Sequence, residues 1–282
     1  MKIGLVEKKK KLESILGEMA PVAVAFSGGV DSSFLLAAAA EFLGNSRVLA
    51  VSAAAEFCSE EEKGDAEDFC RKLGVRRKVM TCSMADISGF DENPPDRCYI
   101  CKTHLFRQLR RVAETAEGGP YHLVEGSNVD DTGDYRPGMK ALAELKVDSP
   151  LLMAGLTKQE IRELSKEMGL PTWDHPSAAC LASRFVYGER ITSPLLRMVD
   201  QSEMFLHRLG FRQVRVRVHG GNLARIEVEP DEAERLFSIR HEVQEVLQRL
   251  GFKYVAIDLG GYRTGSMNEA LHPGDIVQHF KR

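Results

Sequence analysis

Near the N-terminus, a short apolar run ends in a glycine-rich turn and continues into a helix-forming segment. Residues Val22–Phe26 are apolar, the turn reads Ser27-Gly28-Gly29-Val30-Asp31-Ser32, and Ser32–Leu43 is rich in Ala and Leu. An apolar run of this length, bounded by a turn and a helix, is typical of a buried parallel strand. The sequence therefore predicts a strand–turn–helix unit at this point.

The turn has the residues of an anion-binding site. Backbone N–H groups at a helix N-terminus hold anions, and Gly28 and Gly29 let the backbone approach a phosphate closely. Ser27 and Ser32 add hydroxyl donors, and Asp31 is placed to bind magnesium or to cap the helix. The turn lacks the lysine of the Walker loop and the spacing of the Rossmann fingerprint. It matches the PP-loop of the N-type ATP pyrophosphatases, which cleave ATP to AMP and pyrophosphate; the alternative is a plain glycine-rich turn with an aspartate cap.

Strands and helices alternate along the first two thirds of the chain. Strands alternating with helices predict an α/β fold with a doubly wound, parallel five-stranded sheet. The further strands are expected at Val48–Ser52, Arg77–Thr81, Tyr121–Glu125 and, as a short fifth strand, Val147–Leu151. Ligands bind such sheets at the carboxyl ends of the strands where the strand order reverses. With an order 3-2-1-4-5, the loop after the fourth strand flanks the PP-loop.

That loop is dense in polar residues. It contains Gly126–Asp131 and then the run Asp134–Gly138. An adenylate needs polar groups at this edge of the sheet, although a surface turn has a similar composition. The expected nucleotide-binding residues outside the PP-loop are Ser52, at the end of the second strand, and Gly126, Asn128, Asp130 and Arg136.

The pattern changes after residue 188. We expect a PP-loop domain over residues 1–188 and a smaller α+β domain with an antiparallel sheet over residues 189–282. The second domain is expected to have helices at Pro194–Leu209 and Asp231–Leu250, and strands at Val214–Val218, Leu223–Val228 and Tyr254–Leu259.

Composition excludes several classes of protein. The formal net charge is -3, with 43% hydrophobic and 28% charged residues, so nothing global favours nucleic acid or an anionic membrane. The N-terminal segment lacks the features of a signal peptide, and no apolar stretch approaches a membrane helix in length. We therefore expect a cytoplasmic protein, which should hold its thiols reduced.

Three of the six cysteines stand in unusual settings. Cys98 and Cys101 have CxxC spacing, which suits a redox dithiol or half of a metal site, and the second CxxC of a zinc ribbon is absent. Cys180 lies in Ala179-Cys180-Leu181-Ala182-Ser183-Arg184. Three thiolates are able to hold three irons of a 4Fe-4S cluster and leave the fourth iron open. Alternatively, Cys180 is a nucleophile or sulfur donor near the cation Arg184, or a small core residue. Core positions are expected for the other three, Cys58, Cys70 and Cys82.

The chain resembles the LarE family over essentially its whole length, including Gly261–Ser266. The order of three motifs is the same as in that family: the PP-loop, the run from Asn128 to Gly138 and the segment around Cys180. Members are ATP-dependent sulfur transferases that act on pyridinium-3,5-biscarboxylic acid mononucleotide during synthesis of the nickel-pincer nucleotide cofactor. The resemblance implies ATP and Mg2+ as cofactors, adenylation of a substrate carboxylate, and transfer of sulfur from sulfide or a sulfur donor. It also implies a homo-oligomer.

Within this family, a single cysteine matching Cys180 gives up its sulfur in some members. In others, three cysteines matching Cys98, Cys101 and Cys180 bind a 4Fe-4S cluster, and this sequence resembles the latter. The resemblance also assigns Arg215 and Arg217 to the substrate phosphate, and it places Arg184, Glu203 and Glu227 near the substrate. A solvated strand face is the alternative for the two arginines.

Two other functions are compatible with the sequence. One is tRNA thiolation by a PP-loop enzyme with a three-cysteine cluster, for which a basic groove and zinc-finger ends are not evident. The other is a non-catalytic scaffold that binds ATP or an iron–sulfur cluster and delivers sulfur to a partner.

Overall fold

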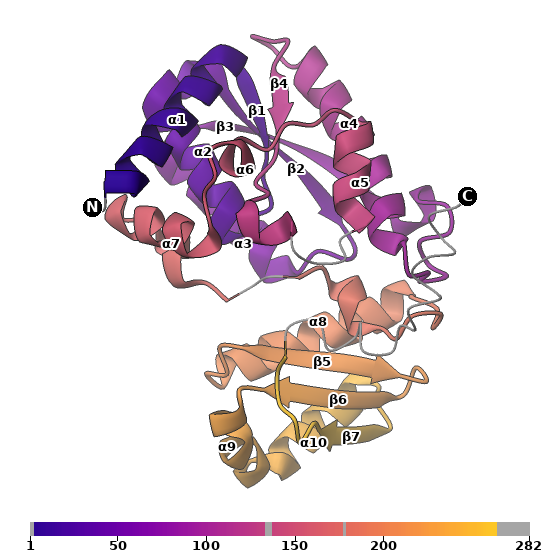
Figure 1. Cartoon of the computed structure of the whole chain (residues 1–282). Coiled ribbons are helices and arrows are strands. Elements are labelled where there is room, and N and C mark those ends of the chain that lie inside the picture. Colours follow the sequence, from indigo (N-terminus) through magenta and orange to yellow (C-terminus); the bar gives the residue numbers. More distant parts are fainter. Residues whose placement is uncertain (1–2, 133–136, 177–178, 264–282) are drawn as a thin grey trace. The chain divides into compact units, whose positions relative to one another are not determined.

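The computed structural model describes residues 3–132, 137–176 and 179–263. The chain forms two compact units (Figure 1). The first contains residues 1–55, 60–82 and 98–178, and the second contains residues 56–59, 83–97 and 179–282. The second unit therefore includes two short segments from the N-terminal part of the chain. A division of the chain at residue 188 stays a prediction.

A parallel sheet forms the centre of the first unit. Its strands β1 (Val22–Ala25), β2 (Val48–Ala55), β3 (Arg76–Cys82) and β4 (His122–Val124) lie in the order β3-β2-β1-β4. All neighbours run parallel, so their carboxyl ends lie at one edge of the sheet.

The expected fifth strand is reduced to one parallel bridge between Val124 and Asp148. The four-residue helix α6 (Pro150–Met153) begins two residues later. Proline has no N–H to donate to a sheet and is favoured at the first position of a helix. Over the described residues, the sheet therefore has four strands rather than the expected five.

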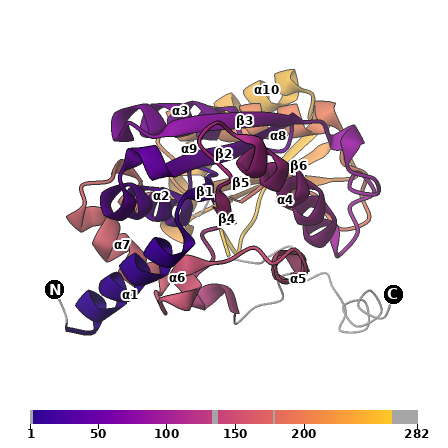
Figure 2. The same ribbon diagram turned by 90° about the horizontal axis from the view of Figure 1, so that it is seen from above.

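Helices cover both faces of this sheet. Buried side chains of α1 (Ile3–Met19), α2 (Val30–Leu43), α3 (Glu60–Leu73) and α7 (Lys158–Glu167) pack on one side with Val22 and Val24 of β1. Those of α4 (Arg97–Thr115) and α5 (Pro137–Glu144) pack on the other side with Ala23. Figure 2 shows α1, α2 and α7 on one side of the strands and α4 on the other. The doubly wound arrangement is confirmed.

The described residues of the second unit form a three-stranded sheet and the helices α8 (Ser193–Arg208), α9 (Ala233–Ser238) and α10 (Arg240–Leu250). Strands β5 (Val214–His219) and β6 (Leu223–Val228) are antiparallel, whereas β7 (Tyr254–Ile257) is parallel to β6. The expectation of an antiparallel sheet was wrong for β7. The helices α9 and α10 connect β6 to β7 and return the chain to the end of the sheet where β6 begins, so the two strands run parallel. The helix expected at Asp231–Leu250 is divided at Ile239, which leaves the helical conformation.

Side chains alternate along β5 and give the strand two different faces. Val214, Val216 and Val218 occupy one face, Arg215 and Arg217 occupy the other, and all five are buried. An arginine pair on a buried strand face needs anionic or carbonyl partners. Across residues 3–132, 137–176 and 179–263, no helix has the length and apolarity to cross a membrane.

Candidate functional site

The PP-loop joins the carboxyl end of β1 to the N-terminus of α2. Gly28 has φ 84, a conformation that glycine adopts without strain, and Gly29 is the N-cap residue of α2. Ser27 and Ser32 close the turn, because their hydroxyl oxygens lie 3.1 Å apart and the Ser32 hydroxyl also donates to the Gly29 carbonyl at 3.2 Å. The first N–H groups of α2 therefore lie at the ligand-binding edge of the sheet, where they suit an anion.

Asp31, in the first turn of α2, contacts a residue that the sequence did not single out. Its Oδ2 accepts from Lys158 Nζ at 2.6 Å. Its Oδ1 is buried and has no hydrogen-bond partner among the residues that the structure describes. A buried carboxylate oxygen without a partner is costly, so this atom suits a cation supplied with a ligand.

Lys158 is the first residue of α7, after a capping box formed by Thr157 and Glu160. Its backbone N–H donates to Asp130 Oδ2 at 2.6 Å, so one residue links the PP-loop to the loop after β4. A cation is unfavourable at a helix N-terminus because of the helix dipole. The sequence therefore contained a signal for Lys158: a lysine directly after a capping threonine does not favour the helix, which indicates a role outside helix stability.

The loop after β4 packs against the start of α2. A Cβ on Gly126 would lie 3.1 Å from Ser32 N and 3.2 Å from the Asp31 carbonyl carbon, so a larger residue would require the start of α2 to shift by a few tenths of an ångström. Asn128 Oδ1 accepts from the Asp130 N–H at 2.9 Å, which shapes the loop from within. The structure thus brings Gly126, Asn128 and Asp130 next to the PP-loop, and Arg136 lies outside the described residues.

Ser52 joins β1, β2 and β3 instead of presenting its hydroxyl to a ligand. The hydroxyl donates to the Phe26 carbonyl at 2.8 Å and accepts from Arg77 Nε at 3.1 Å. Ser52 is 4% exposed. Its side chain therefore holds the start of the PP-loop against the neighbouring strands, and a role of Ser52 in binding a nucleotide stays a prediction.

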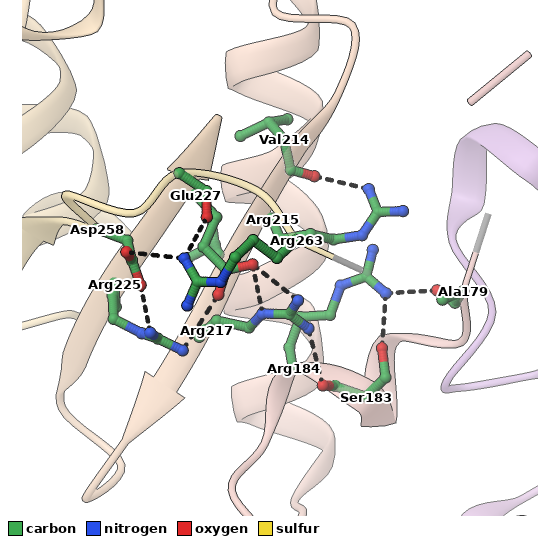
Figure 3. Close-up of polar contacts among 12 residues, drawn as sticks. Ala179, Ser183, Arg184, Val214, Arg215, Arg217, Arg225, Glu227, Asp258 and Arg263 are labelled. Carbon is green, nitrogen blue, oxygen red and sulfur yellow. Dashed lines mark hydrogen bonds and ion pairs between the residues drawn. The ribbon is translucent and has the colours of Figure 1, made fainter. Parts of the chain in front are cut away.

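In the second unit, arginines and carboxylates form a buried network on one face of the small sheet (Figure 3). Glu227 on β6 is 0% exposed. It accepts from Arg217 Nε and Nη2 at 3.0 and 2.8 Å, and it pairs with Arg225 at 3.1 Å. Arg225 also pairs with Asp258, while the Arg215 guanidinium lies 5.5 Å from the centre of the Tyr262 ring.

A second ion pair belongs to the same region. Arg184 Nε and Nη2 donate to the two carboxylate oxygens of Glu203 at 2.9 and 2.7 Å, and both residues are buried. Burial opposes ionisation of Glu203, but Arg184 outweighs it and holds the pKa of this carboxyl below its ordinary value. Burial, followed by repulsion from Arg184, lowers the pKa of Arg215.

Arg215 and Arg217 are each 5% exposed and lie on the same face of β5 within this network. A guanidinium group suits bidentate recognition of a phosphate or a carboxylate. This face of the small sheet is therefore a candidate site for an anionic ligand.

Glu203→Gln should reveal the ion pair in a pH titration. The folded pKa of Glu203 is lowered, so its contribution to stability is complete above the ordinary value of 4.5 and is lost as the pH falls. At neutral pH the variant should lose about 3 kcal/mol of unfolding free energy, because Arg184 is left buried without its carboxylate. Urea unfolding should also show a weaker pH dependence than the wild type below the ordinary carboxyl pKa. Parallel pH curves for the two proteins would contradict the pairing.

The two groups of cysteines belong to different units. Cys98 and Cys101 lie one helical turn apart at the start of α4, the first exposed and the second buried, and Cys180 is exposed at the N-cap of the 3-10 turn Leu181–Arg184. Within the part of the chain that is described, no group of three metal-ligating residues was found. Cys70 and Cys82 are buried and Cys58 is half-buried; burial raises the pKa of the Cys70 thiol to about 11.

A strand, a glycine turn and a helix at the edge of a doubly wound sheet define a PP-loop protein of the class that uses ATP. Residues 9–98 match the NAD synthase family. The chain is 36% identical over 273 residues to the pyridinium-3,5-bisthiocarboxylic acid mononucleotide synthase of Lactiplantibacillus plantarum, covering 97% of this chain and 98% of that protein. The chain therefore belongs to the LarE family.

Two further relatives match over most of their length. An uncharacterized protein of Synechocystis sp. is 37% identical over 269 residues, which cover 95% of this chain and 99% of that protein. An uncharacterized protein of Methanocaldococcus jannaschii is 30% identical over 243 residues, covering 86% and 91%.

Proposed function

We propose that this protein is an ATP-dependent sulfurtransferase that adenylates a carboxylate of pyridinium-3,5-biscarboxylic acid mononucleotide and converts it to a thiocarboxylate. The observation that carries the proposal is the presence in one chain of a PP-loop and, in the second unit, of a buried arginine pair, Arg215 and Arg217. The PP-loop suits ATP, and the arginines suit the phosphate of a mononucleotide.

The chemistry proceeds in two displacements. A carboxylate does not exchange oxygen for sulfur directly, because oxide is a very poor leaving group. A carboxylate oxygen of the substrate therefore attacks the α-phosphorus of ATP, which forms an acyl-adenylate and releases pyrophosphate. A sulfide nucleophile then attacks the acyl carbon, AMP leaves with the electron pair of the broken C–O bond, and a thiocarboxylate remains. The N–H groups of the PP-loop stabilise the charge of the departing pyrophosphate.

Asp31 is the residue that fits magnesium. Its buried Oδ1 has no partner among the described residues, and a carboxylate oxygen is a preferred magnesium ligand. Bound there with the phosphates of ATP, the ion would neutralise negative charge at the leaving group. Lys158, 2.6 Å from Oδ2 of the same carboxylate, would supply a second cation at this site.

Lys158→Met should lower turnover of ATP about 10-fold or more, because a charge that stabilises the departing pyrophosphate is removed. Pyrophosphate release with saturating substrate measures the effect. Lys166→Met, on the same helix, is the matched control and should retain activity. Similar rates for Lys158→Met and the wild type would show that Lys158 only pairs with Asp31.

Cys98, Cys101 and Cys180 would hold a 4Fe-4S cluster. Two thiols at i and i+3 project from one face of α4, Cys180 is exposed, and thiolates are the ligands that such clusters require. When bound through three cysteines, a cluster supplies an open iron position for a sulfide.

Anaerobic reconstitution with iron and sulfide should give about four irons per chain and a broad visible absorption. Cys98→Ser, Cys101→Ser and Cys180→Ser should each lose most of the bound iron, whereas Cys70→Ser should retain it. A colourless wild-type protein after reconstitution would favour Cys180 as a single-use sulfur donor, without a cluster.

The activity itself is tested by anaerobic incubation of the full chain with ATP, Mg2+, sulfide and the biscarboxylated mononucleotide. Mass spectrometry should show a substrate product with one oxygen replaced by sulfur, with AMP and pyrophosphate in equal amounts. Absence of pyrophosphate release would overturn the proposal. Light scattering of the same sample tests the homo-oligomer that we also propose.

A further inference from the structure

Cys180 stands at the exposed end of a turn that is anchored on its other side. The turn Leu181–Arg184 is a single 3-10 element, and Leu181 and Ala182 are buried. The Leu181 N–H also donates to the Phe57 carbonyl at 3.0 Å within the same unit. These contacts anchor the turn from Leu181, the residue next to Cys180, onwards.

Two guanidinium groups hold the carbonyl oxygens around the cysteine. Arg184 Nη1 donates to the carbonyls of Ala179 and Cys180 at 2.5 and 3.1 Å. Arg217 Nη1 donates to the Ser183 carbonyl at 3.0 Å. Arginines therefore hold backbone carbonyls on both sides of Cys180, in addition to the 3-10 bond from the Ser183 N–H to the Cys180 carbonyl at 2.9 Å.

Each of these arginines is itself held by a buried carboxylate. Glu203 takes the Nε and Nη2 edge of Arg184, and its Oε1 also accepts from the Val216 N–H of β5 at 2.8 Å. Glu227 holds Arg217 through one oxygen, because its Oε2 accepts from both Nε and Nη2 of Arg217. The cysteine turn is thus connected through Glu203 to the strand that carries Arg215 and Arg217.

This arrangement costs stability that a hydrophobic packing would not cost. A buried ion pair adds little net stability, because desolvation offsets the attraction between the charges. Its geometry is nevertheless rigid, since a guanidinium bound at two nitrogens keeps the orientation of the third. A buried Arg184–Glu203 pair is therefore better suited to orienting the turn than to stabilising the fold.

We propose that Arg184 and Glu203 are positioning residues that fix the position of Cys180 relative to β5. Through them, binding of a phosphate by Arg215 and Arg217 affects the reactivity of Cys180 in sulfur transfer. The proposal rests on the proposed function. Arg217 belongs both to the contacts of the cysteine turn and to the proposed phosphate site, because its guanidinium contacts the Ser183 carbonyl and lies on the same face of β5 as Arg215.

The first test separates adenylation from sulfur transfer. Arg184→Lys keeps the positive charge but removes the planar guanidinium group, which contacts Glu203 and the carbonyls of Ala179 and Cys180 at the same time. At saturating substrate, pyrophosphate release should stay within about twofold of the wild type, because the PP-loop is in the other unit. Thiocarboxylate formed per pyrophosphate should fall about 10- to 100-fold, the effect of a small misplacement of a reacting group. Equal loss of both, or an unchanged ratio, would overturn the proposal.

The second test needs neither ATP nor sulfur transfer. The rate of Cys180 alkylation by iodoacetamide is measured by peptide mass spectrometry in the full chain, with a chelator present and with or without inorganic phosphate. Phosphate should change this rate severalfold in the wild type. In Arg184→Lys it should bind with similar affinity but leave the rate unchanged.

Arg190→Lys is the matched control, because Arg190 forms an exposed pair with Asp91 in the same unit; it should behave like the wild type. No effect of phosphate on the wild type, or the same effect in Arg184→Lys, would overturn the coupling. Wild-type protein that shows the phosphate effect but releases no pyrophosphate with ATP and substrate would overturn the proposed function and leave the coupling intact.

Discussion

Asp31→Asn is expected to reduce ATP-dependent pyrophosphate release by about 1000-fold or more, since it removes the charge that would hold magnesium at the PP-loop. The fold should be retained, because asparagine keeps a side-chain oxygen that accepts a hydrogen bond from Lys158. In the wild type, Lys158 Nζ lies 2.6 Å from Asp31 Oδ2. Pyrophosphate release is measured with saturating substrate over a range of Mg2+ concentrations.

Asp65→Asn is the matched control for this variant. Asp65 is exposed on α3 in the same unit, and its loss should leave both activity and melting temperature unchanged. If Asp31→Asn released pyrophosphate at the wild-type rate, Asp31 would be only a partner of Lys158 and not a metal ligand. A large fall in melting temperature would instead indicate that the pair is needed for folding.

Arg215→Gln together with Arg217→Gln is expected to weaken binding of the mononucleotide about 100-fold or more, because two charge-assisted contacts to its phosphate are lost. ATP affinity should not change, since the PP-loop lies in the other unit. Binding of each ligand is measured separately by calorimetry. Equal weakening for ATP and substrate would mean that the arginines are structural.

The single variants should differ from each other. Arg217→Gln removes an arginine partner from Glu227, a carboxylate with 0% exposure, so it should also lower the unfolding free energy by about 3 kcal/mol. Arg215→Gln should affect binding more than stability. Arg212→Gln, an exposed neighbour in sequence, is the control and should change neither.

Local sequence patterns predicted the first unit well. The Val22–Phe26 run and its glycine turn predicted β1, the PP-loop and α2, because apolar runs and turn residues act over a few positions. The patterns failed where the partner of a segment decided its structure. Val147–Leu151 resembles a strand, but Pro150 begins α6 after a single bridge at Asp148.

In the candidate site, residue types were easier to foresee than their partners. Asp31 and Gly126 were expected near the nucleotide, and Gly126 packs against the first turn of α2, which contains Asp31. Lys158 was not expected there, since it is 127 residues from Asp31 along the chain. Nothing in a local pattern connects positions so far apart. The same holds for Arg217, which contacts Glu227 on β6 and the carbonyl of Ser183 in the turn Leu181–Arg184.

The Ser27–Ser32 turn and the alternation of Val and Arg along Val214–Val218 were determined by the sequence alone, because glycine conformations and strand periodicity are local properties of the chain. Which charges meet was decided only by the tertiary structure. Folding brings Lys158 to Asp31, Glu203 to Arg184 and Glu227 to Arg217. Buried charges are stable only when they are paired, and the packing of distant elements selects each partner.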